Sequence, residues 1–154
     1  MKIHEWMIAA VAAWLIWAGV GGGGVGPFVP FEPPPIPGAG FRVLILEETA
    51  DRDKLPREQA AILRSTVIRG YLNAHCAKAP DGKTPEYRIL DDDLTPELLK
   101  FERPNFAEAF AKAKTDSQGK TPWLVVSNGE SGTSRPLPAT VDETLKILKQ
   151  YGGE

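Results

Sequence analysis

The chain is poor in the residues that most often carry catalysis or bind metals. It has one cysteine among 154 residues, so no disulfide can form within it, and two histidines are too few to complete a zinc site. It also lacks an excess of charge of one sign, because 18 lysines and arginines stand against 20 aspartates and glutamates. Phosphate recognition needs a basic surface, so we expect no nucleic-acid partner.

The cysteine itself offers little chemistry. Cys76 lies at the C-terminal end of an expected helix, where the helix dipole raises the pKa of a thiol. Its neighbour His75 points about 100° away on a helix, so a Cys-His pair is not expected. We interpret Cys76 as a buried structural thiol; a reactive thiol or an intermolecular disulfide is the alternative.

The other polar clusters also favour structure over chemistry. Three consecutive aspartates at residues 91–93 could bind a hard cation, but at a strand end they more often form a solvated turn that starts a helix. The polar run at residues 127–134 lacks the lysine and spacing of a phosphate-binding loop and indicates a turn. We therefore expect no metal, no cofactor and, on balance, no enzymatic activity.

What the chain does have is an uncharged N-terminal run. No charged residue occurs at residues 6–31, and a membrane core needs about 20 apolar residues. We assign residues 1–25 to a single-pass membrane anchor, with Lys2 favouring a non-cytoplasmic position for the rest of the chain. A cleaved signal peptide and a buried soluble helix are the alternatives.

A spacer rich in glycine and proline follows the uncharged run. Residues 21–40 contain seven glycines and six prolines, a composition that cannot bury a core and that favours a partly stiff, extended linker. We place the linker proper at residues 26–40 and the folded domain at residues 41–154.

The pattern of the domain predicts strands and helices in the order βαβαββα. Strands are expected at residues 41–46, 85–90, 123–127 and 132–137, and helices at residues 57–77, 104–114 and 140–151. Crossover helices make the first two strands parallel, and Asn128-Gly129 predicts a terminal hairpin. Thr140 with Glu143 forms a capping box at the last helix. The class is an α/β sandwich.

This order, together with the run from Pro122 through an apolar strand to Asn128-Gly129-Glu130, resembles the thioredoxin-like fold family over residues 41–151. The resemblance implies that the bond before Pro122 is cis and that the backbone of Thr121 faces a bound extended peptide. It makes Thr121, Pro122 and Trp123 the candidate binding groove, although a tryptophan at the start of a strand is as often part of the core.

Redox members of that family carry Cys-x-x-Cys between the first strand and its helix, where the helix N-terminus lowers the thiol pKa. Residues 47–55 of this chain contain neither cysteine nor serine and hold four acidic side chains. We therefore expect a membrane-tethered, redox-inactive module that binds or scaffolds a protein partner.

Two alternatives remain at this point. One is a degenerate thiol-dependent oxidoreductase that uses Cys76. The other is a structural envelope or virion component in which small residues of the N-terminal helix, Gly19, Gly21 and Gly23, drive homo-oligomer formation.

Overall fold

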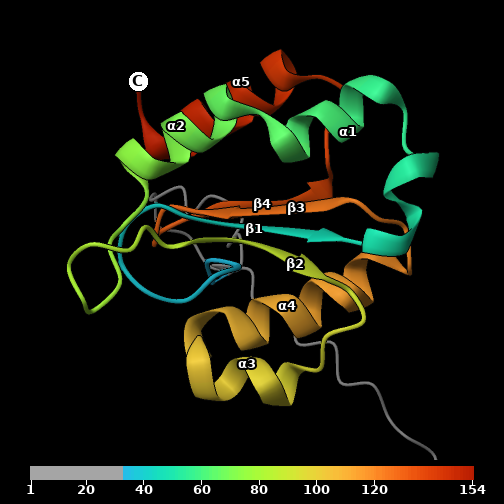
Figure 1. Ribbon diagram of the computed structural model, residues 1–154. Helices are drawn as coiled ribbons and strands as arrows, with labels where there is room; N and C mark the ends of the chain where they lie inside the picture. Colours follow the sequence, from blue (N-terminus) through green and yellow to red (C-terminus); the bar gives the residue numbers. More distant parts are fainter. Residues whose placement is uncertain (1–32) are drawn as a thin grey trace, which may run out of the picture. The chain divides into compact units, whose positions relative to one another are not determined.

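The computed structural model describes residues 33–154, which form an α/β unit with four strands and several helices (Figure 1). The strands are β1 (Arg42–Glu47), β2 (Tyr87–Asp91), β3 (Trp123–Ser127) and β4 (Gly132–Pro136). The α-helices are α1 (Arg57–Arg64), α2 (Thr66–His75), α3 (Pro96–Glu102), α4 (Pro104–Ser117) and α5 (Val141–Gly152), and a 3₁₀ helix, η1 (Thr49–Lys54), follows β1. The predicted α/β class is confirmed.

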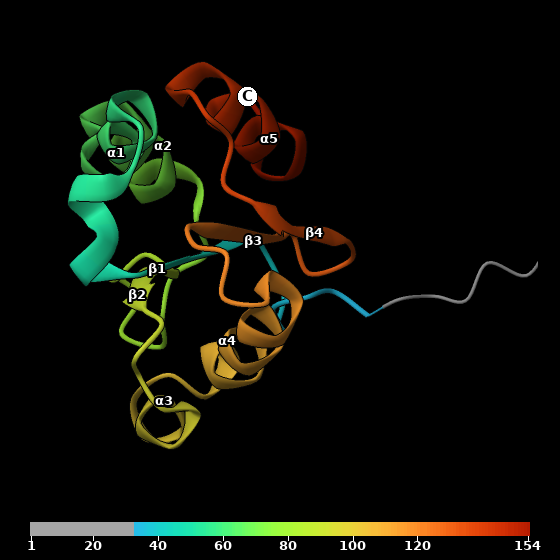
Figure 2. The ribbon, with the colours of Figure 1, turned by 90° about the vertical axis from the view of Figure 1, so that its right-hand side faces the viewer.

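The four strands form one mixed sheet in the order β2-β1-β3-β4. β1 pairs with β2 in parallel, and β3 runs antiparallel to both β1 and β4. The expected parallel pair and the expected terminal hairpin are therefore both present. Helices α1, α2 and α5 cover one face of this sheet, and α4 covers the other with α3 outside it (Figure 2).

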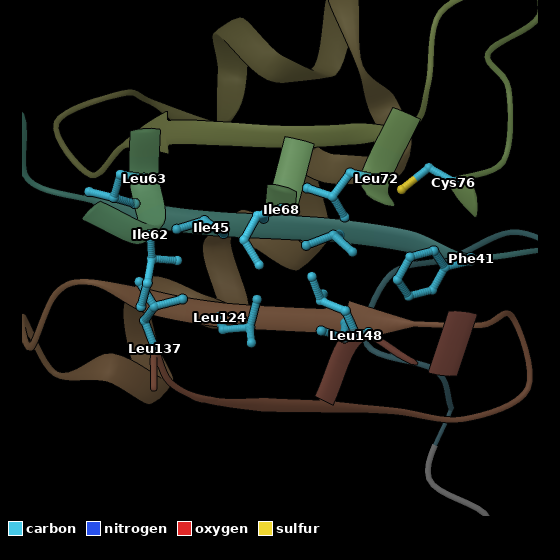
Figure 3. Close-up of a cluster of buried hydrophobic side chains, with 12 residues drawn as sticks. Phe41, Ile45, Ile62, Leu63, Ile68, Leu72, Cys76, Leu124, Leu137 and Leu148 are labelled. Carbon is cyan, nitrogen blue, oxygen red and sulfur yellow. The ribbon is translucent and has the colours of Figure 1, made fainter. Parts of the chain in front are cut away.

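The two central strands, β1 and β3, are buried along their whole length, which explains why they are almost continuously apolar in sequence. Alternate side chains enter two separate cores. Val43, Ile45, Leu124 and Val126 pack under α1, α2 and α5, as Figure 3 shows in part. On the opposite face, Leu44, Leu46, Trp123 and Val125 pack against the alanines and phenylalanines of α4.

The single helix expected at residues 57–77 is wrong, because the chain breaks at Ser65. This residue has an extended backbone, and its Oγ accepts a hydrogen bond from the Ile68 amide at 3.2 Å. Serine favours this N-cap position over a helix interior. The break produces two short helices, α1 and α2, both of which bury residues against the sheet.

The packed region begins before Phe41, within the segment expected to be the linker. Ile36 is fully buried in the core on the α4 face, and the Ser127 hydroxyl donates a hydrogen bond to its carbonyl at 3.1 Å. We call residues 33–40 the proline strap. Its core contact means that at least part of the expected spacer belongs to the folded unit.

The last helix begins as the sequence indicates. Thr140 caps α5, and its Oγ1 accepts a hydrogen bond from the Glu143 amide at 3.2 Å. The predicted membrane anchor at residues 1–25, by contrast, lies outside the described residues. Within residues 33–154, none of the helices has the length and apolar character needed to cross a bilayer.

Candidate functional site

Three chain segments that are distant in sequence meet at one end of the sheet. The strand register places Glu47 of β1 beside Asp91 of β2, and Leu46 beside Trp123 of β3. The residues just before β3 therefore lie next to the last residue of β1. We call this the Thr121 end of the sheet.

Thr121 and Pro122 are positioned by the start of β3 and the end of β4. The bond between them is cis, as the resemblance implied. Pro122 is buried and its carbonyl accepts a hydrogen bond from the Leu137 amide at 3.0 Å. Thr121 is half-buried, and within residues 33–154 neither its N–H nor its C=O has a hydrogen-bond partner. One backbone donor and one acceptor are thus left open at this end.

Trp123, the third candidate groove residue, is directed into the protein. Its side chain is only 9% exposed and packs in the core on the α4 face. The indole Nε1 donates a hydrogen bond to the Ser134 hydroxyl at 2.9 Å, and that hydroxyl donates in turn to the Asp116 carboxylate at 3.1 Å. The indole therefore fixes β3 against β4 and α4 and presents little surface to a ligand.

The loop after β1 is organised by an ion pair. Glu47 is only 3% exposed, and Arg52 of η1 holds its carboxylate with two nitrogens, one at 2.7 Å. This contact raises the pKa of Arg52, chiefly through the hydrogen bond to Glu47. A fork-shaped pair of this kind is geometrically specific. It organises the loop between β1 and α1, which contains no cysteine.

Four carboxylates gather next to Glu47, which pairs with Asp91 in the sheet. Oxygens of Glu48, Asp91, Asp92 and Asp93 all lie within 4.8 Å of one another. Asp91 accepts hydrogen bonds from the Thr49 amide at 3.1 Å and from the Asp93 amide at 3.0 Å. Its pKa is lowered, chiefly by the Thr49 side chain and then by these amides. The aspartates form the turn that the sequence indicated.

The remaining members of the cluster differ in their hydrogen bonds. The Glu48 carboxylate accepts a bond from the Ala50 amide at 3.0 Å and so caps η1. The Asp92 and Asp93 side chains cap no backbone group and form no ion pair within the described part of the chain. Within the cluster, these two are the carboxylates that hold no backbone amide.

Cys76 lies at the opposite end of the sheet. It is 4% exposed beside Leu72 (Figure 3), and the next residue, Ala77, donates its amide to the carbonyl of Phe41, just before β1. Burial raises the pKa of the Cys76 thiol to about 12. The thiol is therefore protonated near neutral pH and is a poor nucleophile.

A buried ion pair closes the same end. Arg42 Nε lies 3.0 Å from Glu86 Oε2, with the two side chains only 10% and 6% exposed. Arg42 also donates to the carbonyl of Ala39 in the proline strap. We call this the Arg42 end of the sheet. This pair was missed from the sequence, since neither residue belongs to a motif and only their positions inside two expected strands hint at it.

A groove runs along β4 from the Arg42 end of the sheet, where Gly132 pairs with Ser127 and Ser127 with Arg42. It has a volume of about 460 Å³ and runs between the proline strap, α4 and β4. Its lining residues are Pro33, Pro35, Lys112, Asp116 and the β4 region from Ser131 to Ser134. Neither Thr121 nor Pro122 contributes to it.

Comparison of the chain with protein-family models, with curated proteins and with solved structures finds no match.

Proposed function

We propose that the chain is a redox-inactive, thioredoxin-like module that binds an extended segment of a partner protein at Thr121. The element order βαβαββα, with helices 57–64 and 66–75 counted as one connection and 96–102 and 104–117 as another, supports this assignment. So does the sheet order β2-β1-β3-β4 with β3 antiparallel to its neighbours.

The observation that carries the proposal is the open backbone of Thr121. An unpaired backbone donor and acceptor must find partners in water or in another chain. Because Thr121 directly precedes Pro122 and β3, its N–H and C=O stand where an extended segment can add main-chain hydrogen bonds to the sheet. Such bonds supply affinity whatever the side chains of the partner are.

Binding, and not thiol chemistry, is the function that the side chains favour. The loop after β1 holds the Glu47–Arg52 pair and no thiol. Cys76 is buried at the Arg42 end, separated from Thr121 by the length of β1. A partner bound at Thr121 could not reach this sulfur without opening the core.

The N-terminal sequence supports a tethered form of this module. Its uncharged run at residues 6–31 suits a single-pass anchor that keeps the domain on the non-cytoplasmic side. Tethering raises the effective concentration of the domain for a partner in the same membrane, so even a modest affinity at Thr121 becomes useful.

The proposal is tested with the full chain in detergent micelles and a displayed library of heptapeptides. We expect selected peptides to bind and to perturb the backbone amide resonance of Thr121 and its neighbours more than any others. The same peptides methylated at alternate backbone nitrogens should lose binding, because methylation removes the donors that a strand-like pairing needs.

A Cys76→Ser variant provides the matched control for thiol chemistry. Binding should be unchanged in this variant, because the sulfur lies at the other end of the sheet. Selected peptides that perturb only residues remote from Thr121, or whose binding survives backbone methylation, would contradict the proposed site. Loss of binding in the Cys76→Ser variant would instead favour the alternative in which the protein depends on its thiol.

A further inference from the structure

The loops that flank the open Thr121 backbone carry a strong excess of negative charge. Residues 47–54 and 91–93 contain seven acidic and two basic side chains. Both basic side chains already form ion pairs, Arg52 with Glu47 and Lys54 with Asp51. Five carboxylates of these loops, those of Glu48, Asp53, Asp91, Asp92 and Asp93, form no ion pair within residues 33–154.

Nearby cations do not cancel this charge. Lys114 of α4 directs its ammonium group to the carbonyl of Asp92, and Lys120 precedes Thr121 in sequence. Arg57, three residues after Lys54, also forms no ion pair within residues 33–154. Three bases against five unpaired carboxylates still leave the surface acidic. Crowding contributes at Glu48. The Ala50 amide lowers the pKa of Glu48, but the hydrogen bond with the Asp92 carboxyl, desolvation and the charges of Asp92 and Asp91 together outweigh this effect and raise the pKa.

The acidic loops lie within reach of a chain bound at Thr121. Adjacent strands are about 4.8 Å apart, so Asp91 on β2 is two strand spacings, about 10 Å, from Pro122 at the start of β3. Side chains of an extended segment alternate between its two sides. A lysine or arginine one or two residues from the paired position can therefore extend over Glu47 toward Asp92 and Asp93.

We propose that the partner segment that docks at Thr121 is cationic, with lysine or arginine side chains that face the carboxylates of Asp92 and Asp93. This inference rests on the proposed function and adds the chemistry of its partner. Complementary charge accelerates encounter and rejects acidic segments, while the main-chain pairing holds the complex together. Neutral extended segments bind at the same place but more weakly.

The experiment measures binding of three labelled peptides to the full chain in detergent micelles by fluorescence anisotropy. The peptides share the pattern Val-X-Val-X-Val-X-Val, with lysine, norleucine or glutamate at every X. We expect the lysine peptide to bind at least about tenfold more tightly than the glutamate peptide at low salt. The difference should shrink as salt is raised, because the screening length falls to about 3 Å at 1 M.

Two double variants then locate the charge effect. Asp92→Asn/Asp93→Asn should weaken the lysine peptide about fivefold and leave the norleucine peptide unchanged, since each exposed ion pair contributes up to about 1 kcal/mol. The control, Glu108→Gln/Glu130→Gln, removes the same net charge from exposed positions on α4 and in the hairpin loop. It should leave all three peptides unaffected.

The outcomes separate this inference from the proposed function. If all three peptides bind equally well and perturb Thr121, the module remains a peptide binder and the cationic preference is overturned. If none of the peptides binds, both proposals fail. If the aspartate variant and its control weaken the lysine peptide equally, the preference reflects net charge alone and the assigned carboxylates are wrong. If calcium binding is abolished in the aspartate variant while peptide binding is unchanged, the cluster serves a divalent cation and the inference is overturned.

Discussion

The two ends of the sheet differ in whether their charged side chains and backbone polar groups have partners within the protein. At the Arg42 end, the buried charges of Arg42 and Glu86 neutralise each other at 3.0 Å, and the proline strap covers the neighbouring backbone. At the Thr121 end, five carboxylates are unpaired within the described residues and Thr121 keeps an open donor and acceptor. The first arrangement gives its buried polar groups partners inside the fold, whereas the second leaves carboxylates and backbone groups open, as the proposed binding site requires. Local departures of this kind are expected at functional sites.

The largest effect on stability is expected from a substitution that removes one member of the buried ion pair at the Arg42 end. Arg42→Met leaves the Glu86 carboxylate buried without its partner, which should lower the free energy of unfolding by about 3–5 kcal/mol. The measurement is urea denaturation followed by circular dichroism.

The control for this loss is Lys54→Met. It breaks the Lys54–Asp51 pair of the other end, whose side chains are 76% and 50% exposed, and should cost no more than about 1 kcal/mol. The double variant Arg42→Met/Glu86→Met should recover much of the loss, because it removes both buried charges. A loss below 1 kcal/mol for Arg42→Met would show that this pair does not hold the end closed.

A smaller effect is expected at the hairpin loop that packs on the proline strap. Gly129 has a φ of 92°, and a Cβ placed there would lie 2.9 Å from the Gly40 nitrogen and 3.0 Å from the Ala39 Cα. Gly129→Ala should therefore lower the free energy of unfolding by about 2–4 kcal/mol. Part of this loss comes from the left-handed backbone and part from contact of the new methyl group with the proline strap.

Gly82→Ala separates these two contributions. Gly82 also has a positive φ, 69°, but a Cβ there meets nothing within 4 Å. The Gly82→Ala substitution should lower the free energy of unfolding only by the backbone contribution, about 1–2 kcal/mol. Equal losses for the two variants, measured in the same urea titrations, would mean that the strap yields to the added methyl group and contributes little to closing the Arg42 end.

The smallest effect is expected at the Thr121 end. Asp92→Asn/Asp93→Asn removes two carboxylates that cap no backbone group among the described residues, so the free energy of unfolding should change by less than about 0.5 kcal/mol. Any change should be stabilising, because like charges crowd this turn. A loss of 2 kcal/mol or more would assign these aspartates a structural role and erase the contrast between the two ends.

The sequence predicts the centre of this fold better than its margins. β1, β3 and α5 are found within one or two residues, because their burial is complete or their caps are specific. The break at Ser65 was missed because the apolar spacing continues through it, and only the serine hydroxyl marks the new cap. Burial of Ile36 was missed because a lone apolar residue among prolines has no periodicity.

The candidate site, too, could be predicted from the sequence only in part. A resemblance at Pro122 located the end of the sheet where strands and acidic loops meet, and the lack of thiols there was plain from sequence. The pairing of Glu47 with Arg52 and the inward position of the Trp123 indole depend on three-dimensional contacts that no local pattern encodes. Sequence therefore located the surface but not which side chains remain free on it.

The burial of Ile36 also determines where this polypeptide can be cut. A fragment that starts at Pro33 would keep every buried side chain of the described residues. Cleavage between Ile36 and Phe41 would instead detach a side chain that fills the layer beneath α4, beside Leu44 and Phe110. Shortened versions of the protein should accordingly retain the chain from Pro33 onward, since one that starts at Phe41 would carry a void in its second core.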